Sequence, residues 1–227
     1  MKRTIFKGVL LGLISFLIIV IITVELTIII NNSLHIIEIN KSYTNDDFGI
    51  VTYTSNMDKD KDGIDDQTDF LQNVREYIAK KPKYKSEYYA GGYPTGEYGV
   101  CTDVIAVAAL NTGYDLRTLV NEDIKSRKED YDIDIIDIDI DFRRAKNLNE
   151  YLEKNAIELT TDLSKIEEWQ GGDIVVFKGH IGVVSDKRNE NGIPYLIHHA
   201  NAFQTIYEEP GGLERLNDII IGHYRLS

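Results

Sequence analysis

The sequence GDIVVFKGHIGVVS, residues 172–185, indicates the fold of this chain most clearly. It holds two short apolar runs, 173–177 and 180–185, which are rich in Ile and Val and bounded by Gly. Runs of this length and composition are typical of β-strands. Two more runs of the same kind follow at 195–199 and 219–225. The C-terminal part is therefore expected to consist of consecutive strands.

The chain before these strands has a helical periodicity instead. Apolar residues recur at helical spacing over 68–80, with Thr68 or Asp69 as the cap and Pro82 after the end. Further helices are expected at 102–110, which is almost wholly apolar, at 116–128 and around 148–152. Helices followed by consecutive strands predict an α+β fold with an antiparallel sheet.

One segment between the helices alternates with a period of two. Over residues 130–141 Asp alternates with Tyr or Ile, and the phase breaks at Ile135 and Ile136. The pattern predicts a half-exposed strand with a bulge, whose charges protect an edge from aggregation. Trp169 is expected in the core.

Composition excludes several classes of protein. The 227 residues carry 25 basic and 37 acidic side chains, a formal net charge of −12. An acidic surface repels phosphate backbones, so we expect no nucleic-acid partner. The single Cys excludes an internal disulfide framework and any multi-Cys metal site. The proportions of apolar and charged residues are those of a folded protein.

The N-terminus predicts a membrane anchor. Residues 5–24 are apolar apart from one Lys, and a helix of about 20 residues spans the bilayer core. Residues 1–30 are therefore expected to form a single transmembrane helix. The alternative, a cleaved secretory signal, lacks a small-residue cleavage site. Three basic residues come before or early in the span, namely Lys2, Arg3 and Lys7. By the positive-inside rule the N-terminus is cytoplasmic and the domain is extracytoplasmic, at the cell membrane.

A polar stretch after the anchor leads to a calcium-type loop. Residues 31–57 are expected to be a stalk with little structure. Residues 58–69, DKDKDGIDDQTD, follow the calcium-loop template, with a Gly at the turn and Asp in place of the usual final Glu. The predicted ligands of a structural Ca²⁺ are Asp58, Asp60, Asp62, the carbonyl of Ile64, and Asp69. The competing interpretation is a solvated acidic turn.

The lone Cys and the histidines suggest a nucleophilic site. Cys101 comes directly before the apolar helix, where the helix dipole and free amides favour a thiolate and stabilise an oxyanion. His180 opens one predicted strand, and His198 and His199 lie on the next. Facing residues of antiparallel strands lie about 5 Å apart, so one His can orient another. The competing interpretation is a core Cys with surface histidines.

Several short motifs carry a resemblance to known families. The chain resembles the NlpC-type cell-wall cysteine peptidases, which have a papain-like fold, in the stretches YAGGYP (89–94), GVCTD (99–103), GDIVVF (172–177), HIGVV (180–184) and LIH (196–198). It more closely resembles a bacterial exported family catalogued as domain of unknown function 1287, in GVCTDV (99–104), LVNED (119–123), DFRRAKNL (141–148), HIGVVSD (180–186) and GHYR (222–225). The resemblance implies an NlpC-like domain over residues 70–227.

The resemblance also implies roles for single residues. It makes Cys101 the nucleophile, His180 the base and His198 the orienting third residue, with His199 as the alternative because a one-residue slip exchanges the faces of a strand. Tyr88 or Tyr89 would help the oxyanion. Arg144 would have a structural or carboxylate-binding role, unless it pairs with a neighbouring Asp.

The expected function follows from these roles. We expect a membrane-anchored, extracytoplasmic thiol hydrolase of amide bonds that acts on cell-wall peptide or peptidoglycan and needs no cofactor for catalysis. The alternative is a non-catalytic, calcium-stiffened surface binding module on the same fold.

Overall fold

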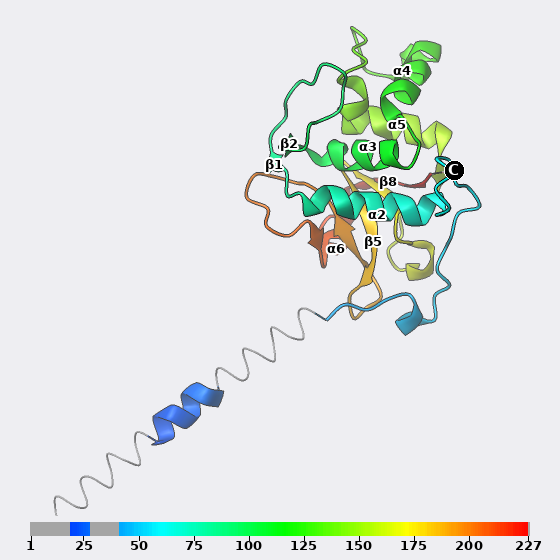
Figure 1. Cartoon of the computed structure of the whole chain (residues 1–227). Coiled ribbons are helices and arrows are strands. Elements are labelled where there is room, and N and C mark those ends of the chain that lie inside the picture. The colour runs from blue at the N-terminus through cyan, green and yellow to red at the C-terminus, as the bar shows by residue number, and fades with distance from the viewer. Residues whose placement is uncertain (1–18, 28–40, 227) are drawn as a thin grey trace, which may run out of the picture. The chain divides into compact units, whose positions relative to one another are not determined.

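The computed structural model describes residues 19–27 and 41–226, which fall into two units, Met1–Lys41 and Ser42–Ser227 (Figure 1). In the first unit residues 19–27 are helical. None of the helices in the described ranges has the length and apolar character needed to cross a membrane. Most of the expected anchor, residues 1–30, and the first part of the expected stalk lie outside the described residues.

The centre of the second unit is one antiparallel sheet. Its strand order is β3-β8-β4-β5-β6-β7, and every neighbouring pair is antiparallel. The strands are β3 (Ile157–Glu158), β4 (Ile174–Phe177), β5 (His180–Arg188), β6 (Pro194–Ile197), β7 (Glu208–Glu209) and β8 (Ile220–Arg225). The predicted α+β class with an antiparallel sheet is confirmed.

Helices precede the long strands, as expected. They are α2 (Asp66–Ala79), α3 (Cys101–Asn111), α4 (Leu116–Ser126) and α5 (Ala145–Asn155), with a short α6 (Gly212–Arg215) late in the chain. The cap of α2 is Asp65, whose carboxylate accepts the amide of Thr68, so the helix begins earlier than the periodicity predicts. Apolar residues mark the buried length of a helix, whereas capping residues mark its true start.

The sheet has a hydrophobic core on each face. Alternate residues of β4 point to opposite sides, so Ile174 and Val176 join one core while Val175 and Phe177 join the other. The larger core packs against α2, α3, α4 and α5, whose ribbons lie together over one face of the sheet in Figure 1. The smaller core includes Trp169, which is fully buried as expected.

The remaining elements are short. A two-stranded parallel ladder joins β1 (Lys83–Tyr84) to β2 (Tyr98–Gly99) just before α3. The 3-10 helices are η1 (Asp46–Phe48), η2 (Lys128–Asp130), η3 (Asp141–Arg143), η4 (Ile166–Glu168) and η5 (Asn217–Ile219).

The strand expected over residues 130–141 is not formed. The segment runs through bends and turns from the last residue of η2 to the first residue of η3. Its Asp side chains bind nearby backbone amides: Asp141 accepts from the amide of Asp137 at 2.7 Å, and Asp137 from that of Asp139 at 3.0 Å. These local hydrogen bonds give the backbone an alternative to a ladder. The period-two pattern was therefore misleading.

The segment that follows the first unit also differs from the expectation. Residues 42–57 belong to the second unit and are not a stalk with little structure. Tyr43 forms a β-bridge with Arg188 of β5, the buried amide of Asn45 donates to Gln170 at 2.9 Å, and Ile50 is buried. Long-range contacts of this kind leave no signal in a short polar sequence.

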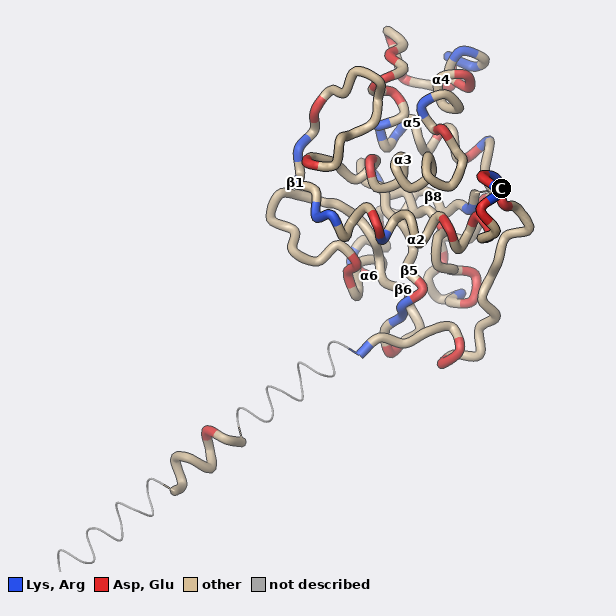
Figure 2. Tube along the Cα trace, viewed as in Figure 1, with Lys and Arg blue, Asp and Glu red and all other residues tan. Residues whose placement is uncertain are grey.

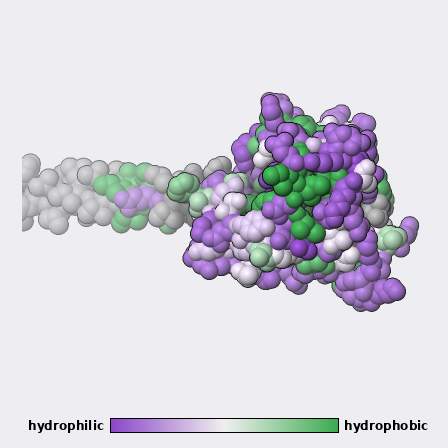
Figure 3. Space-filling view, turned by 90° about the horizontal axis from the view of Figure 1, so that it is seen from above, coloured by the Kyte–Doolittle hydropathy of each residue, from purple (hydrophilic) through white to green (hydrophobic). Residues whose placement is uncertain are grey.

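Charged residues are spread over much of the second unit. Figure 2 shows acidic segments on the helices, on the loops and where the chain enters α2. The space-filling view from above shows hydrophilic residues around one central hydrophobic area (Figure 3).

Candidate functional site

Cys101 is the first residue of α3. Val100 before it is extended, and the Asp103 carboxylate accepts a hydrogen bond from the Val100 amide at 2.8 Å, so the helix is capped directly before Cys101. The Cys101 thiol accepts hydrogen bonds from the amides of Ile181 and Thr102. Ile181 directly follows His180, so the thiol contacts the start of β5.

Burial controls the charge of this thiol. It raises the pKa of Cys101 more than the surrounding amides lower it, and the Asp103 charge adds to the increase. The position of Cys101 at the start of a helix was expected to favour a thiolate. In the free protein the protonated thiol is favoured instead, and a base must take its proton for attack.

A buried ion pair holds the start of α3. The Arg143 Nε lies 2.6 Å from one oxygen of Asp103 and its Nη2 lies 2.9 Å from the other, with both side chains almost fully buried. Arg143 also donates to the carbonyl of Glu87 at 2.6 Å, and Thr102 donates to the Arg143 carbonyl. Arg144 is half exposed, 4.0 Å from Asp141. The residue that supports α3 is therefore Arg143, whereas the sequence favoured Arg144.

His180 and His198 meet across two strands. The Nε2 of His180 lies 2.8 Å from the Nδ1 of His198. Val183 of β5 pairs with Ile197 of β6, which fixes this register. Gly182 permits the close approach, because a Cβ there would lie 2.9 Å from the Ile197 carbonyl. The expected contact between two histidines is present, and its second member is His198, which directly follows β6.

A carboxylate extends this contact to a row of three hydrogen-bonded side chains, His180, His198 and Glu209. Glu209 of β7 lies 2.8 Å from the Nε2 of His198, and Arg215 of α6 lies 2.7 Å from Glu209. Burial acts to raise the pKa of Glu209, but hydrogen bonds from Arg215 and His198 outweigh it and lower the pKa. Glu209 carries no signal in the sequence, because it lies on a two-residue strand with no pattern of its own.

The row fixes which ring nitrogens carry protons. An ionised carboxylate only accepts, so the Nε2 of His198 must donate to Glu209. In neutral His198 the Nδ1 is then an acceptor, and His180 donates to it from Nε2. The Nδ1 of His180 is left without a proton, as a base requires. Burial lowers the pKa of His180 to about 4, and nearby His198 and Arg215 add to this effect.

His199 lies outside the row. Its ring meets Tyr84 edge-on, with ring centres 5.1 Å apart, and also packs on Tyr207. It is buried, and its Nδ1 has no hydrogen-bond partner among the described residues. The structure thus brings His180 together with His198 and places His199 among aromatic rings.

The tyrosines differ from the expectation. The Tyr88 hydroxyl donates to Asp137 and Asp139, and that of Tyr89 lies 3.4 Å from the Tyr98 carbonyl under the Arg143 guanidinium. Burial raises the pKa of Tyr84, which the sequence did not single out, and the charge of Cys101 adds to the increase. A pocket of about 480 Å³ adjoins the row, lined by His198, Glu209, Arg215 and residues 200–206 apart from Ala202.

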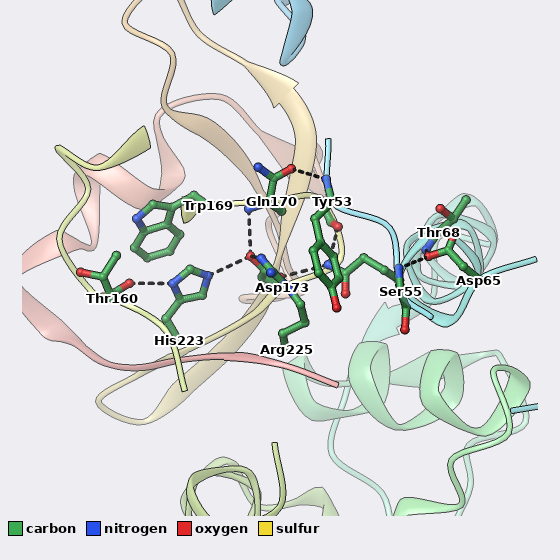
Figure 4. A network of polar contacts seen from close by, with 12 residues as sticks. Tyr53, Ser55, Asp65, Thr68, Thr160, Trp169, Gln170, Asp173, His223 and Arg225 are labelled. Atoms are coloured by element: carbon green, nitrogen blue, oxygen red, sulfur yellow. Dashed lines mark hydrogen bonds and ion pairs between the residues drawn. The ribbon is translucent and has the colours of Figure 1, made fainter. Parts of the chain in front are cut away.

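A second polar cluster is structural (Figure 4). Both Asp173 oxygens are used, by the forked guanidinium of Arg225 and by His223, Gln67 and the amide of Gln170. His223 stacks on Trp169, with ring centres 3.9 Å apart. The other ring nitrogen of His223, Nδ1, lies 2.6 Å from the Thr160 carbonyl, and the cluster ties β4, β8 and α2 together.

The predicted calcium loop has converging oxygens. Oxygens of Asp58, Asp60 and Asp62 lie within 4.8 Å of one another, all exposed. Gly63 has φ of 93°, the positive value that the turn needs. Asp69 lies on the first turn of α2 and is buried. Ile64 lies between Asp62 and Asp69 in the sequence.

Comparisons with known proteins agree on one family. The family model described as "Domain of unknown function (DUF1287)" matches residues 71–226. "Uncharacterized protein YijF" of Escherichia coli (strain K12) is 32% identical over 167 residues, which cover 68% of this chain and 77% of the relative. No solved structure matches significantly.

Proposed function

Because the chain belongs to the DUF1287 family, and its motifs resemble NlpC-type peptidases, we propose that it is a thiol-dependent hydrolase of amide bonds in cell-wall peptide. The observation that carries the proposal is the hydrogen-bonded row from His180 through His198 to Glu209, which starts one residue from the backbone amide that contacts Cys101. A core Cys with surface histidines would have no reason to form such a row.

The row supports general-base catalysis. His180 takes the thiol proton on Nδ1 as the sulfur of Cys101 attacks the amide carbon, and amides at the start of α3 hold the oxyanion. The intermediate collapses to a thioester, and the leaving amine takes the proton from His180. Water then attacks the thioester with His180 again as base, which releases the acid and restores the thiol. Glu209 keeps His198 in the tautomer that this sequence of steps needs.

The location and substrate come from the sequence. Residues 1–30 are proposed as a single span with the N-terminus in the cytoplasm, which puts the domain outside, against the cell wall. Peptidoglycan stems carry carboxylates, which Arg side chains bind. Arg215 is half exposed in the pocket beside His198 and is placed for such a contact.

Loss of the nucleophile tests the proposal. The full chain is incubated with purified peptidoglycan, and soluble fragments are followed by mass spectrometry. We expect wild type to release peptide fragments and Cys101→Ala, with unchanged melting temperature, to release none. Equal release by both proteins would overturn the proposal.

One observation favours a second candidate. The Cys101 thiol is mostly buried and its pKa is raised, as in a structural cysteine. A non-catalytic binding module on the same fold would keep peptidoglycan affinity and lack turnover. Co-sedimentation of the full chain with peptidoglycan, without release of fragments, would favour this module.

A further inference from the structure

The strand that carries Glu209 has few backbone contacts to hold it. β7 consists of Glu208 and Glu209, and it is the last strand at one edge of the sheet, paired with Leu196 and Ile197 of β6. So short a strand forms few ladder hydrogen bonds, and at an edge it has no second neighbour to fix its register. The position of Glu209 beside His198 therefore needs further support.

The two side chains of β7 point to opposite faces of the sheet, because side chains alternate along a strand. Glu208 pairs with Ile197, which belongs to the larger core together with residues of α2. Glu209 pairs with Leu196, which belongs to the smaller core. One Glu thus faces α2, while the other faces His198 and α6.

Glu208 is the centre of a clamp formed by four side chains, Arg75, Ser185, Lys187 and Glu208 itself. One oxygen of Glu208 lies 2.7 Å from Nη2 of Arg75 on α2 and accepts from Ser185 of β5 at 2.6 Å. The other oxygen accepts from Lys187 of β5 at 2.6 Å. Burial acts to raise the pKa of Glu208, but the bonds from Arg75, Lys187 and Ser185 outweigh it and lower the pKa. An ionised Glu208 therefore ties β7 to two other elements.

The guanidinium of Arg75 is itself held in place. It forms a fork with both oxygens of Asp186 on β5, and its Nη2 also lies 3.3 Å from the Ser185 hydroxyl. Charge-assisted and forked hydrogen bonds of this kind fix geometry more strongly than neutral ones. The clamp thus places the Glu208 carboxylate relative to α2 and β5.

The clamp and the row together specify the register of β7. Because its two residues are identical, a slip by one position would put one Glu in place of the other. A slip in one direction would bring Tyr207 into the clamp, and a slip in the other would bring Pro210 to His198. Only the observed register supplies both places with a carboxylate.

We propose that Arg75 and Glu208 are positioning residues, which hold β7 so that Glu209 accepts from His198 and fixes the tautomer of the row. A carboxylate that moves away leaves the proton of neutral His198 free to occupy either ring nitrogen. His180 would then lose its fixed partner. The effect on the rate rests on the proposed function, whereas the effect on the tautomer is a property of the free protein.

The tautomer of His198 tests the clamp independently of activity. Long-range ¹⁵N–¹H NMR of the labelled full chain in detergent, near neutral pH, shows which ring nitrogen carries the proton, and His198→Asn assigns the signals by their loss. Wild type should carry it on Nε2 alone. Arg75→Met should show both tautomers, and so should Glu208→Gln, which keeps the shape of the side chain. Lys80→Met, which removes an exposed positive charge at the end of α2, should match wild type.

Rates on a soluble wall peptide test the link to catalysis. In both clamp variants kcat should fall roughly tenfold while KM stays within about twofold, because the base is disturbed and the pocket is not. A wild-type tautomer of His198 in both variants would overturn the proposal, even if their melting temperatures were lower. If wild type cleaves no peptide, the proposed function fails, and the tautomers still decide whether the clamp positions Glu209.

Discussion

Two hydrogen bonds of 2.8 Å distinguish the adjacent histidines His198 and His199. His198 receives one bond from His180 and gives the other to Glu209. His199 contacts aromatic rings and no member of the row. If catalysis uses the row, His198 affects the reaction through His180, and His199 does not.

We therefore expect His198→Ala to lower kcat/KM roughly 10²-fold or more, because His180 loses its orienting partner. His198→Asn should recover part of this loss, since an amide can accept from His180 and donate to Glu209. His199→Phe keeps the aromatic packing and should stay within a few-fold of wild type. Rates on a soluble wall peptide measure all three, and a larger loss in His199→Phe than in His198→Ala would contradict this assignment.

At the scale of elements, the α3 helix depends on one ion pair. Asp103 caps the helix that carries Cys101, and Arg143 of η3 holds Asp103 through two hydrogen bonds. Neither side chain is exposed. Removing one partner of such a pair leaves a buried charge without compensation.

Arg143→Met should therefore lower the free energy of unfolding by roughly 3–5 kcal/mol. The matched control is the neighbouring Arg144→Met, which removes a half-exposed charge and should change it by no more than about 0.5 kcal/mol. Urea unfolding followed by circular dichroism measures both. Equal effects of the two substitutions would show that the buried pair does not support α3.

Patterns in the sequence predicted the structure where they have a local physical cause. Apolar spacing located the central strands and four helices, because burial of one face acts along each element. Contacts between distant segments were missed: Glu209 and Arg143 reach the site only through tertiary structure. The strand predicted for residues 130–141 was wrong for the opposite reason. There, local hydrogen bonds from backbone amides to Asp carboxylates overrode an alternation that resembles a strand. The fold class was thus predictable, whereas only part of the candidate site was.

At the scale of the whole molecule, buried histidines link stability to pH. Burial lowers the pKa of His180 to about 4, and it also lowers the pKa values of His198 and His199. Between the unfolded value of 6.5 and the folded value, the unfolded chain binds more protons than the folded one. The stability contributed by neutral histidines is thus complete above pH 6.5 and falls as the pH falls toward 4.

For His180 alone, the free energy of unfolding should drop by roughly 2 kcal/mol between pH 7.5 and pH 5. The raised pKa values of Asp69 and Asp141 act in the opposite direction. His180→Gln isolates the effect, because it should lose less stability than wild type over this range. Identical pH dependence of the two proteins in urea titrations would contradict a neutral, buried His180.

The most direct test of the account is the mass of the products made in ¹⁸O-labelled water. The full chain and Cys101→Ala are incubated with purified peptidoglycan, and the fragments are analysed by mass spectrometry. Wild type is expected to release fragments whose new carboxylate carries one ¹⁸O, because water resolves the thioester, and Cys101→Ala is expected to release none. Fragments without ¹⁸O would indicate acyl transfer, and labelled fragments from Cys101→Ala at the wild-type rate would contradict the account.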